Sequence, residues 1–152
     1  MRTWLGVMFL LGCGGPAAGE GTLELGTGEV GFETLEDYQP VALVAGPQGG
    51  HHIWLSLRAE GLSSDRVLLE VDAVPLEETE PPPRREPVRI FMTPVEGDMR
   101  EIVGWPAQLA EPECLVDVPL SVRVTLTDSR GNQISDERIV VPQDDPLLGE
   151  CL

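Results

Sequence analysis

The stretch His51-His52-Ile53-Trp54-Leu55-Ser56-Leu57-Arg58-Ala59 carries the clearest structural pattern in the chain, because apolar and polar side chains alternate along it. An alternation with a period of two residues is typical of a β-strand that buries one face. We therefore expect a half-buried strand here. Its buried face would carry Ile53, Leu55, Leu57 and Ala59, and its other face His52, Trp54, Ser56 and Arg58.

Runs of similar length flank this stretch and are separated by residues that favour turns. The expected strands cover residues 30–35, 40–45, 66–74, 88–93, 100–103, 116–126 and 134–141. The last two would form a hairpin across Thr127-Asp128-Ser129-Arg130-Gly131-Asn132, which has the composition of a turn. About eight short strands without a helical repeat predict an all-β fold, an antiparallel β-sandwich that is immunoglobulin-like in broad layout.

Two proline-containing segments interrupt these strands. Residues 75–87 include Pro81-Pro82-Pro83, and consecutive prolines lack N–H donors and favour an extended, solvated chain. We expect a protruding loop there, and the alternative is a polyproline segment that binds a partner. Residues 105–114 contain helix formers with proline on both sides, so at most a turn or two of helix is expected.

The first residues have the pattern of an export signal. Arg2 precedes an apolar run from Trp4 to Leu11, and a short positive start followed by such a run is typical of a signal peptide. A membrane-spanning helix needs about 20 apolar residues. This run is therefore too short to cross a bilayer.

Directly after that run, Leu10-Leu11-Gly12-Cys13 resembles the lipobox of bacterial lipoproteins. The resemblance implies that residues 1–12 are removed and that Cys13 becomes the lipid-attachment residue, with a thioether-linked diacylglycerol and an acylated amine. Gly14, in place of aspartate, follows the cysteine, which by analogy with envelope sorting implies the outer membrane. The alternative is an ordinary signal peptide cut near Pro16-Ala17-Ala18-Gly19.

The lipobox interpretation divides the chain into three parts. Residues 1–12 would be the signal peptide, and residues 13–28, which are poor in large apolar side chains, a flexible tether. Residues 29–152 would form the β-sandwich domain, a size that suits one unit with a modest core.

The charge of the chain excludes some classes of partner. The formal net charge is −16, with 26 acidic and 10 basic residues. Nucleic-acid binding depends on clustered basic side chains that neutralise phosphates, so no nucleic-acid partner is expected. Adsorption to anionic lipid is disfavoured for the same reason, and membrane attachment would depend on the acyl chains.

Two cysteines remain in the body of the chain, Cys114 and Cys151. In an exported protein an even pair indicates a disulfide bridge. The alternatives are two free thiols or soft metal ligands. We expect the bridge, which would tie the last residues to the body of the domain.

The chain offers few candidates for chemistry. His51-His52 is its only imidazole pair, and neighbours on a strand point to opposite faces, so both would bind one ion only if the strand end were distorted. Asp128, Asp136 and Glu137 could share a calcium ion, although the sequence around Asp128 primarily predicts a turn. There is no GxSxG motif, and we expect no catalytic residues, no bound metal and no cofactor.

The expected function is therefore a non-catalytic binding or structural role at the cell envelope. The chain would be held to the membrane by its N-terminal lipid, with another envelope protein or a surface polymer as partner. Trp54 and Arg58 are candidate contact residues for that partner if they are exposed, and Trp54 covers a second layer of core if it is not. The alternative function is a small metal-handling or enzyme-accessory domain centred on His51 and His52.

Overall fold

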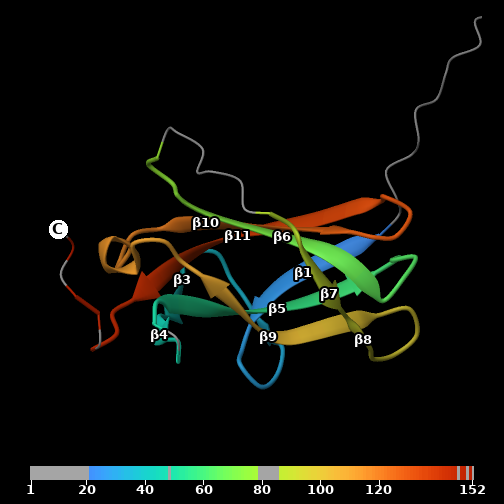
Figure 1. The fold of residues 1–152 in the computed structure, drawn as a ribbon, viewed down its shortest axis with the longest axis horizontal. Coiled ribbons are helices and arrows are strands. Elements are labelled where there is room, and N and C mark those ends of the chain that lie inside the picture. Colours follow the sequence, from blue (N-terminus) through green and yellow to red (C-terminus); the bar gives the residue numbers. More distant parts are fainter. Residues whose placement is uncertain (1–20, 48, 79–85, 147, 150, 152) are drawn as a thin grey trace, which may run out of the picture.

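Two β-sheets pack face to face in the computed structural model, which describes residues 21–47, 49–78, 86–146, 148, 149 and 151 (Figure 1). The first sheet has the order β2 (Glu33–Thr34), β1 (Thr22–Thr27), β5 (His51–Glu60), β9 (Arg100–Gln108) and β8 (Thr93–Pro94), and β4 (Val44–Ala45) also pairs with β5. The second has the order β3 (Gln39–Ala42), β11 (Gln133–Gln143), β10 (Leu120–Thr127), β6 (Arg66–Pro75) and β7 (Val88–Phe91). A single turn of 3-10 helix, η1 (Pro112–Cys114), follows β9. The predicted all-β sandwich is confirmed.

The core lies between the two central strands, β5 and β10. The predicted inward face of β5 is confirmed, because Ile53, Leu55, Leu57 and Ala59 are all buried. The facing residues of β10 are the alternating apolar set Leu120, Val122, Val124 and Leu126, each fully buried. Such alternation buries one face of each strand in the space between the two sheets.

Several expected boundaries are wrong. Residues 22–27, expected within the tether, form β1, because Leu25 packs into the core and residues 22–26 pair with β5. Residues 105–108, expected as a turn or short helix, continue β9, and only η1 is helical there. Residues 30–32 and 116–119 lie outside strands. The remaining part of the expected tether and the signal peptide, up to residue 20, lie outside the described residues.

The sandwich also departs from the expected antiparallel arrangement at one place. The described part of β3 pairs in parallel with β11, with Gln39 opposite Val140 and Ala42 opposite Gln143. The other described strand pairs are antiparallel. The parallel pair places β3 at the border of the second sheet, beside the last strand.

The two lateral borders of the sandwich differ. On one border β1 contacts β11, and a carboxylate of Asp136 accepts a hydrogen bond from the backbone N–H of Leu25 at 2.9 Å. On the other border, β7 pairs only with Arg66–Leu69 of β6, and β8 pairs only with Arg100 and Glu101 of β9. Beyond these short ladders the described residues provide no strand to cover the second halves of β6 and β9.

Candidate functional site

The uncovered border forms a groove between the second halves of β6 and β9. Its larger cavity, of about 540 Å³, is lined by Val71, Asp72, Ala73, Pro75, Glu78, Leu109, Ala110, Glu111, Cys114 and Leu115. An adjoining cavity of about 320 Å³ is lined by Leu69, Val71, Glu86, Val88, Trp105, Pro106, Ala107 and Gln108. Val71 lines both cavities, which therefore adjoin at this residue.

The floor of the groove is the edge of the core. In the first half of β6, Val67 and Leu69 are only 2% exposed, but the next inward-facing residues, Val71 and Ala73, are half-buried. Trp105 of β9 is half-buried in the same way. Apolar side chains that face inward from both sheets are therefore incompletely covered along this border.

The rim of the groove is acidic. Asp72, Glu78, Glu86 and Glu111 line the two cavities, and no described arginine or histidine does. Glu111 adopts a left-handed backbone conformation with φ +48° immediately before η1. The cavity thus combines an apolar floor with a rim that attracts positive charge.

The far end of the groove is fixed by a disulfide. Cys114 of η1 is bonded to Cys151, with the two Cα atoms 4.8 Å apart. The bridge predicted from the even cysteine pair is confirmed. It holds the cavity wall formed by η1 to the end of the chain.

Trp54 and Arg58, the candidate contact residues, lie on the outer face of β5 and are half-buried. The indole of Trp54 meets the ring of His52 edge to face, with the ring centroids 4.4 Å apart. The guanidinium of Arg58 lies 4.1 Å above the ring of Phe32 and forms an ion pair with Glu101 at 2.7 Å. Both side chains therefore make contacts within the domain.

The loop that follows β1 covers part of this outer face. Ser56, fully buried between Trp54 and Arg58, donates a hydrogen bond to the carbonyl oxygen of Gly28 and accepts one from the N–H of Gly104. A Cβ atom on Gly104 would lie only 2.3 Å from the carbonyl oxygen of Glu29. The outer face of β5 is thus a second packed layer around Ser56 and not an open surface.

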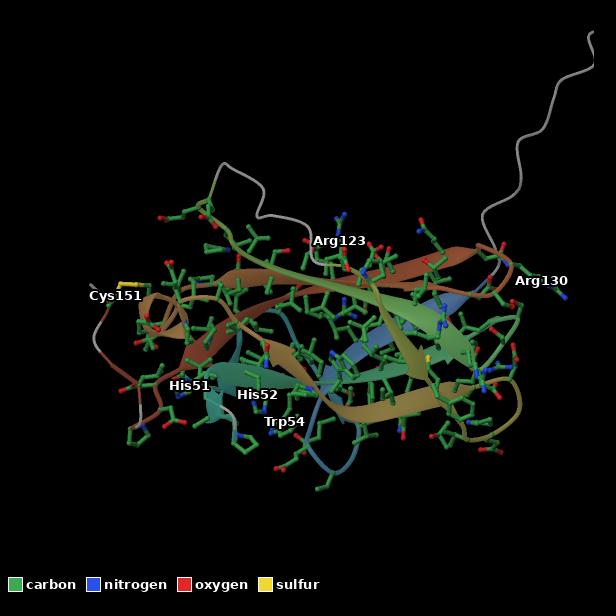
Figure 2. All side chains as sticks on the ribbon, in the orientation of Figure 1. His51, His52, Trp54, Arg123, Arg130 and Cys151 are labelled. Atoms are coloured by element: carbon green, nitrogen blue, oxygen red, sulfur yellow. A yellow bond between two sulfur atoms is a disulfide. The ribbon has the colours of Figure 1, made fainter. Side chains whose placement is uncertain are left out.

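His51 and His52 point to opposite faces of β5, as the strand period predicts, and Figure 2 shows them at the same end of the sandwich. Nε2 of His51 lies 3.8 Å from a carboxylate oxygen of Asp145. Nε2 of each histidine is buried and has no hydrogen-bond partner among the described residues. Burial lowers the pKa of His52, the nearby His51 lowers it further, and Glu29 opposes both. The groove is lined by neither histidine.

The three acidic residues considered for calcium are not brought together. Asp128 accepts hydrogen bonds within its own turn from Arg130 and Asn132. Asp136 binds the backbone of Leu25, and Glu137, on the opposite face of β11, pairs with Arg123. Among the described residues, no three His, Cys, Asp or Glu side chains converge as a metal site would require.

Comparison of the chain with known protein families, with curated proteins and with solved structures found no match. No helix in the described part of the chain is long and apolar enough to cross a bilayer.

Sequence reasoning missed the groove. The inward orientation of Val71 and Ala73 could be predicted from the alternation in residues 66–74. What could not be predicted is that β7 begins only opposite Leu69 and β8 only opposite Glu101. These starting points depend on pairing with distant strands, and beyond them the described residues leave the apolar border without a covering strand.

Proposed function

We propose that this chain is a lipid-anchored protein of the bacterial cell envelope with a non-catalytic binding role. The lipobox-like sequence Leu10-Leu11-Gly12-Cys13 supports the anchor, and Gly14 favours the outer membrane. The partner is another envelope protein. The acidic net charge of −16 is consistent with attachment through acyl chains and not through basic patches.

The point at which the chain enters the domain supports a binding role. Gly21, just before β1, lies close to Glu60 and Ile134, since an added Cβ would be 2.8 Å from the carbonyl oxygen of Glu60 and 2.9 Å from a methyl carbon of Ile134, at the end of the sandwich where the β10–β11 hairpin turns. Figure 2 shows Arg130 of that turn and Cys151 at opposite ends of the molecule. A tether that joins the domain at Gly21 would present the disulfide end and the larger cavity away from the membrane.

The anchor is tested with the full chain expressed in a Gram-negative host. We expect mass spectrometry to find a mature N-terminus at Cys13 with attached acyl chains. Globomycin, which blocks the lipoprotein signal peptidase, should leave the unprocessed precursor. The matched control is Cys13→Ser, for which mass spectrometry should find no attached acyl chain and no mature N-terminus at residue 13. A mature chain that begins near Ala18 and carries no lipid would overturn the anchor.

The binding role is tested separately by cross-linking and capture of the full-length protein from its native envelope. We expect one or a few envelope proteins to be recovered with the wild-type chain. Recovery that is no greater than with an unrelated lipoprotein of similar charge would contradict the binding role. This result would leave the anchor unaffected.

A further inference from the structure

We propose that the outer face of β6 and β7 binds a segment of a partner protein in which carboxylate side chains flank an apolar one. The binding surface is formed by Arg66, Leu68, Arg89 and Phe91, hereafter the arginine patch. The inference rests on the binding role proposed above, and it depends neither on the lipid anchor nor on the groove.

The register of β6 and β7, which lie side by side in Figure 1, fixes the arrangement of the patch. Arg66 lies opposite Phe91, and Leu68 lies opposite Arg89. All four side chains face outward, because the residues between them on each strand are buried in the core. The two arginines therefore occupy one diagonal of the patch, and Leu68 and Phe91 occupy the other. Diagonal neighbours on a sheet are about 7–8 Å apart, so the apolar side chains lie between the two charges.

The apolar part of the patch is open to solvent. Phe91 is 58% exposed and Leu68 is 37% exposed. A single exposed apolar side chain is common on protein surfaces, but these two are neighbours on adjacent strands. Aromatic and arginine side chains are enriched where proteins contact each other. An apolar side chain of the partner would cover Phe91 and Leu68 and provide the hydrophobic contribution to binding.

Both arginines of the patch are exposed, and neither guanidinium has an ion-pair or hydrogen-bond partner among the described residues. This distinguishes them from the arginines of the other described strands, which are held in ion pairs: Arg58 with Glu101, Arg100 with Asp65, Arg123 with Glu137 and Arg138 with Asp136. Arginine forms paired hydrogen bonds with carboxylates. The patch therefore offers two donors of this kind to an acidic partner.

The net charge of −16 does not prevent an acidic segment from binding here. Exposed charges are screened over about 8 Å at physiological salt, so the closest groups decide the interaction. Asp65, which precedes Arg66 in the chain, is already bound to Arg100 at 2.7 Å. Glu70, the next outward residue of β6, forms no ion pair with either arginine of the patch. The positive charge of the patch is therefore left for the partner.

The small number of charges favours a protein segment over a lipid surface as the occupant. Recognition of anionic lipid by a basic cluster typically uses four to eight lysine or arginine side chains. The patch supplies two. Two carboxylates on either side of one apolar side chain are enough to match it.

The test uses the full-length protein, labelled with 15N and purified in detergent, and a capped peptide, Glu-Ser-Leu-Ser-Glu-Ser-Leu-Ser-Glu. In an extended chain this spacing places glutamate and leucine on one face. We expect saturable shifts of the amide and arginine side-chain resonances of residues 66–68 and 89–91. The control peptide, with lysine in place of glutamate, should leave these resonances unchanged, because the patch repels its charges.

Two variants separate the contributions. Arg66→Gln/Arg89→Gln should weaken binding of the glutamate peptide about tenfold, since each exposed ion pair contributes modestly. Phe91→Ser should also weaken it about tenfold, through the loss of apolar contact. The matched control Arg123→Gln/Arg130→Gln removes the same charge at exposed positions outside the patch, both labelled in Figure 2, and should bind as the wild type does.

Equal binding by the wild type and both patch variants would overturn the proposal, as would an equal loss in the matched control. Shifts at the patch with phosphatidylglycerol vesicles but not with the glutamate peptide would show a lipid-facing surface and also overturn it. If a native partner is captured equally well by the wild type and Arg66→Gln/Arg89→Gln, the binding role stands and the patch assignment fails. If the peptide binds at the patch but no envelope protein is captured, the patch assignment stands and the binding role fails.

Discussion

The backbone N–H of Ser63 donates a hydrogen bond to Oδ2 of Asp128 at 3.1 Å. This bond joins the loop between β5 and β6 to the turn between β10 and β11. The other carboxylate oxygen accepts the N–H groups of Arg130 and Asn132 at 2.8 and 3.0 Å. Burial raises the pKa of Asp128, but hydrogen bonds from Ser63 and Asn132 outweigh it and hold the pKa well below its ordinary value of 3.8. The carboxylate thus organises both loops in its charged form.

We expect Asp128→Asn to lower the free energy of unfolding by about 2 kcal/mol at pH 7, because an amide replaces one acceptor oxygen with a donor. A carboxylate with a depressed folded-state pKa stabilises the protein above its unfolded-state pKa, and this contribution is lost as the pH falls toward the folded-state pKa. Urea unfolding at pH 7 and pH 3 should show the difference between the two proteins shrinking at pH 3. A difference that is constant with pH would contradict this role, and Asp144→Asn, at an exposed position, is the control.

Gly104 is expected to tolerate no side chain. Its φ of +67° is strained for other residues, and an added Cβ would lie 2.3 Å from the carbonyl oxygen of Glu29. Gly131, with φ +83° and no atom within 4 Å of an added Cβ, is a matched control for the backbone effect alone. Gly131→Ala should lower the free energy of unfolding by about 1–2 kcal/mol. Gly104→Ala should lower it by about 1–3 kcal/mol more. Equal thermal shifts for the two variants would show that the loop after β1 moves away freely.

His52 is expected to make stability depend on pH near neutrality. Because burial and His51 lower its folded-state pKa below 6.5, the unfolded chain binds the proton more readily. The contribution of neutral His52 is therefore complete above pH 6.5 and decreases as the pH falls toward the folded-state pKa. Wild-type protein should lose stability relative to His52→Gln between pH 7.5 and pH 5.5, measured by chemical unfolding.

The variant His51→Gln isolates the contribution of the His51 ring to the pKa of His52. In His51→Gln the repulsion between the two imidazoles is removed, so the pKa of His52 should rise and the pH-dependent loss should become smaller. A loss of the same size in both backgrounds would indicate that burial alone sets the pKa of His52.

Removal of the Cys114–Cys151 bridge should lower stability by roughly 3–4 kcal/mol in the loop-entropy model, because the bonded residues are 37 positions apart. We expect Cys114→Ser/Cys151→Ser to show the same melting temperature with and without reductant. The wild type should match it only when reduced. An unchanged wild-type melt on complete reduction, verified by thiol titration, would show that the bridge adds no stability.

The sequence was informative where strands bury one complete face. The alternation in residues 53–59 predicted the inward face of β5, and Val122, Val124 and Leu126 predicted that of β10. Prediction failed where a strand depends on distant partners. β1 has only Leu23 and Leu25 as large apolar side chains, and it forms because β5 supplies its ladder.

The candidate site was harder to foresee than the fold. Trp54 and Arg58 were considered for their chemistry, but Phe32, Glu101 and the loop after β1 engage that face. The groove depends instead on where β7 and β8 begin. Strand ends are set by the competition among long-range pairings, which composition and spacing do not encode.

The position of β1 has a mechanical consequence. Its residues from Thr22 to Gly26 are paired in one continuous antiparallel ladder with β5. A partner held at the disulfide end and a tether pulling at Gly21 would load this ladder along the strand axis. All hydrogen bonds of the ladder would then bear the force together. The domain would therefore resist extension more strongly than a hairpin that is pulled open from one end, in which the hydrogen bonds break one after another.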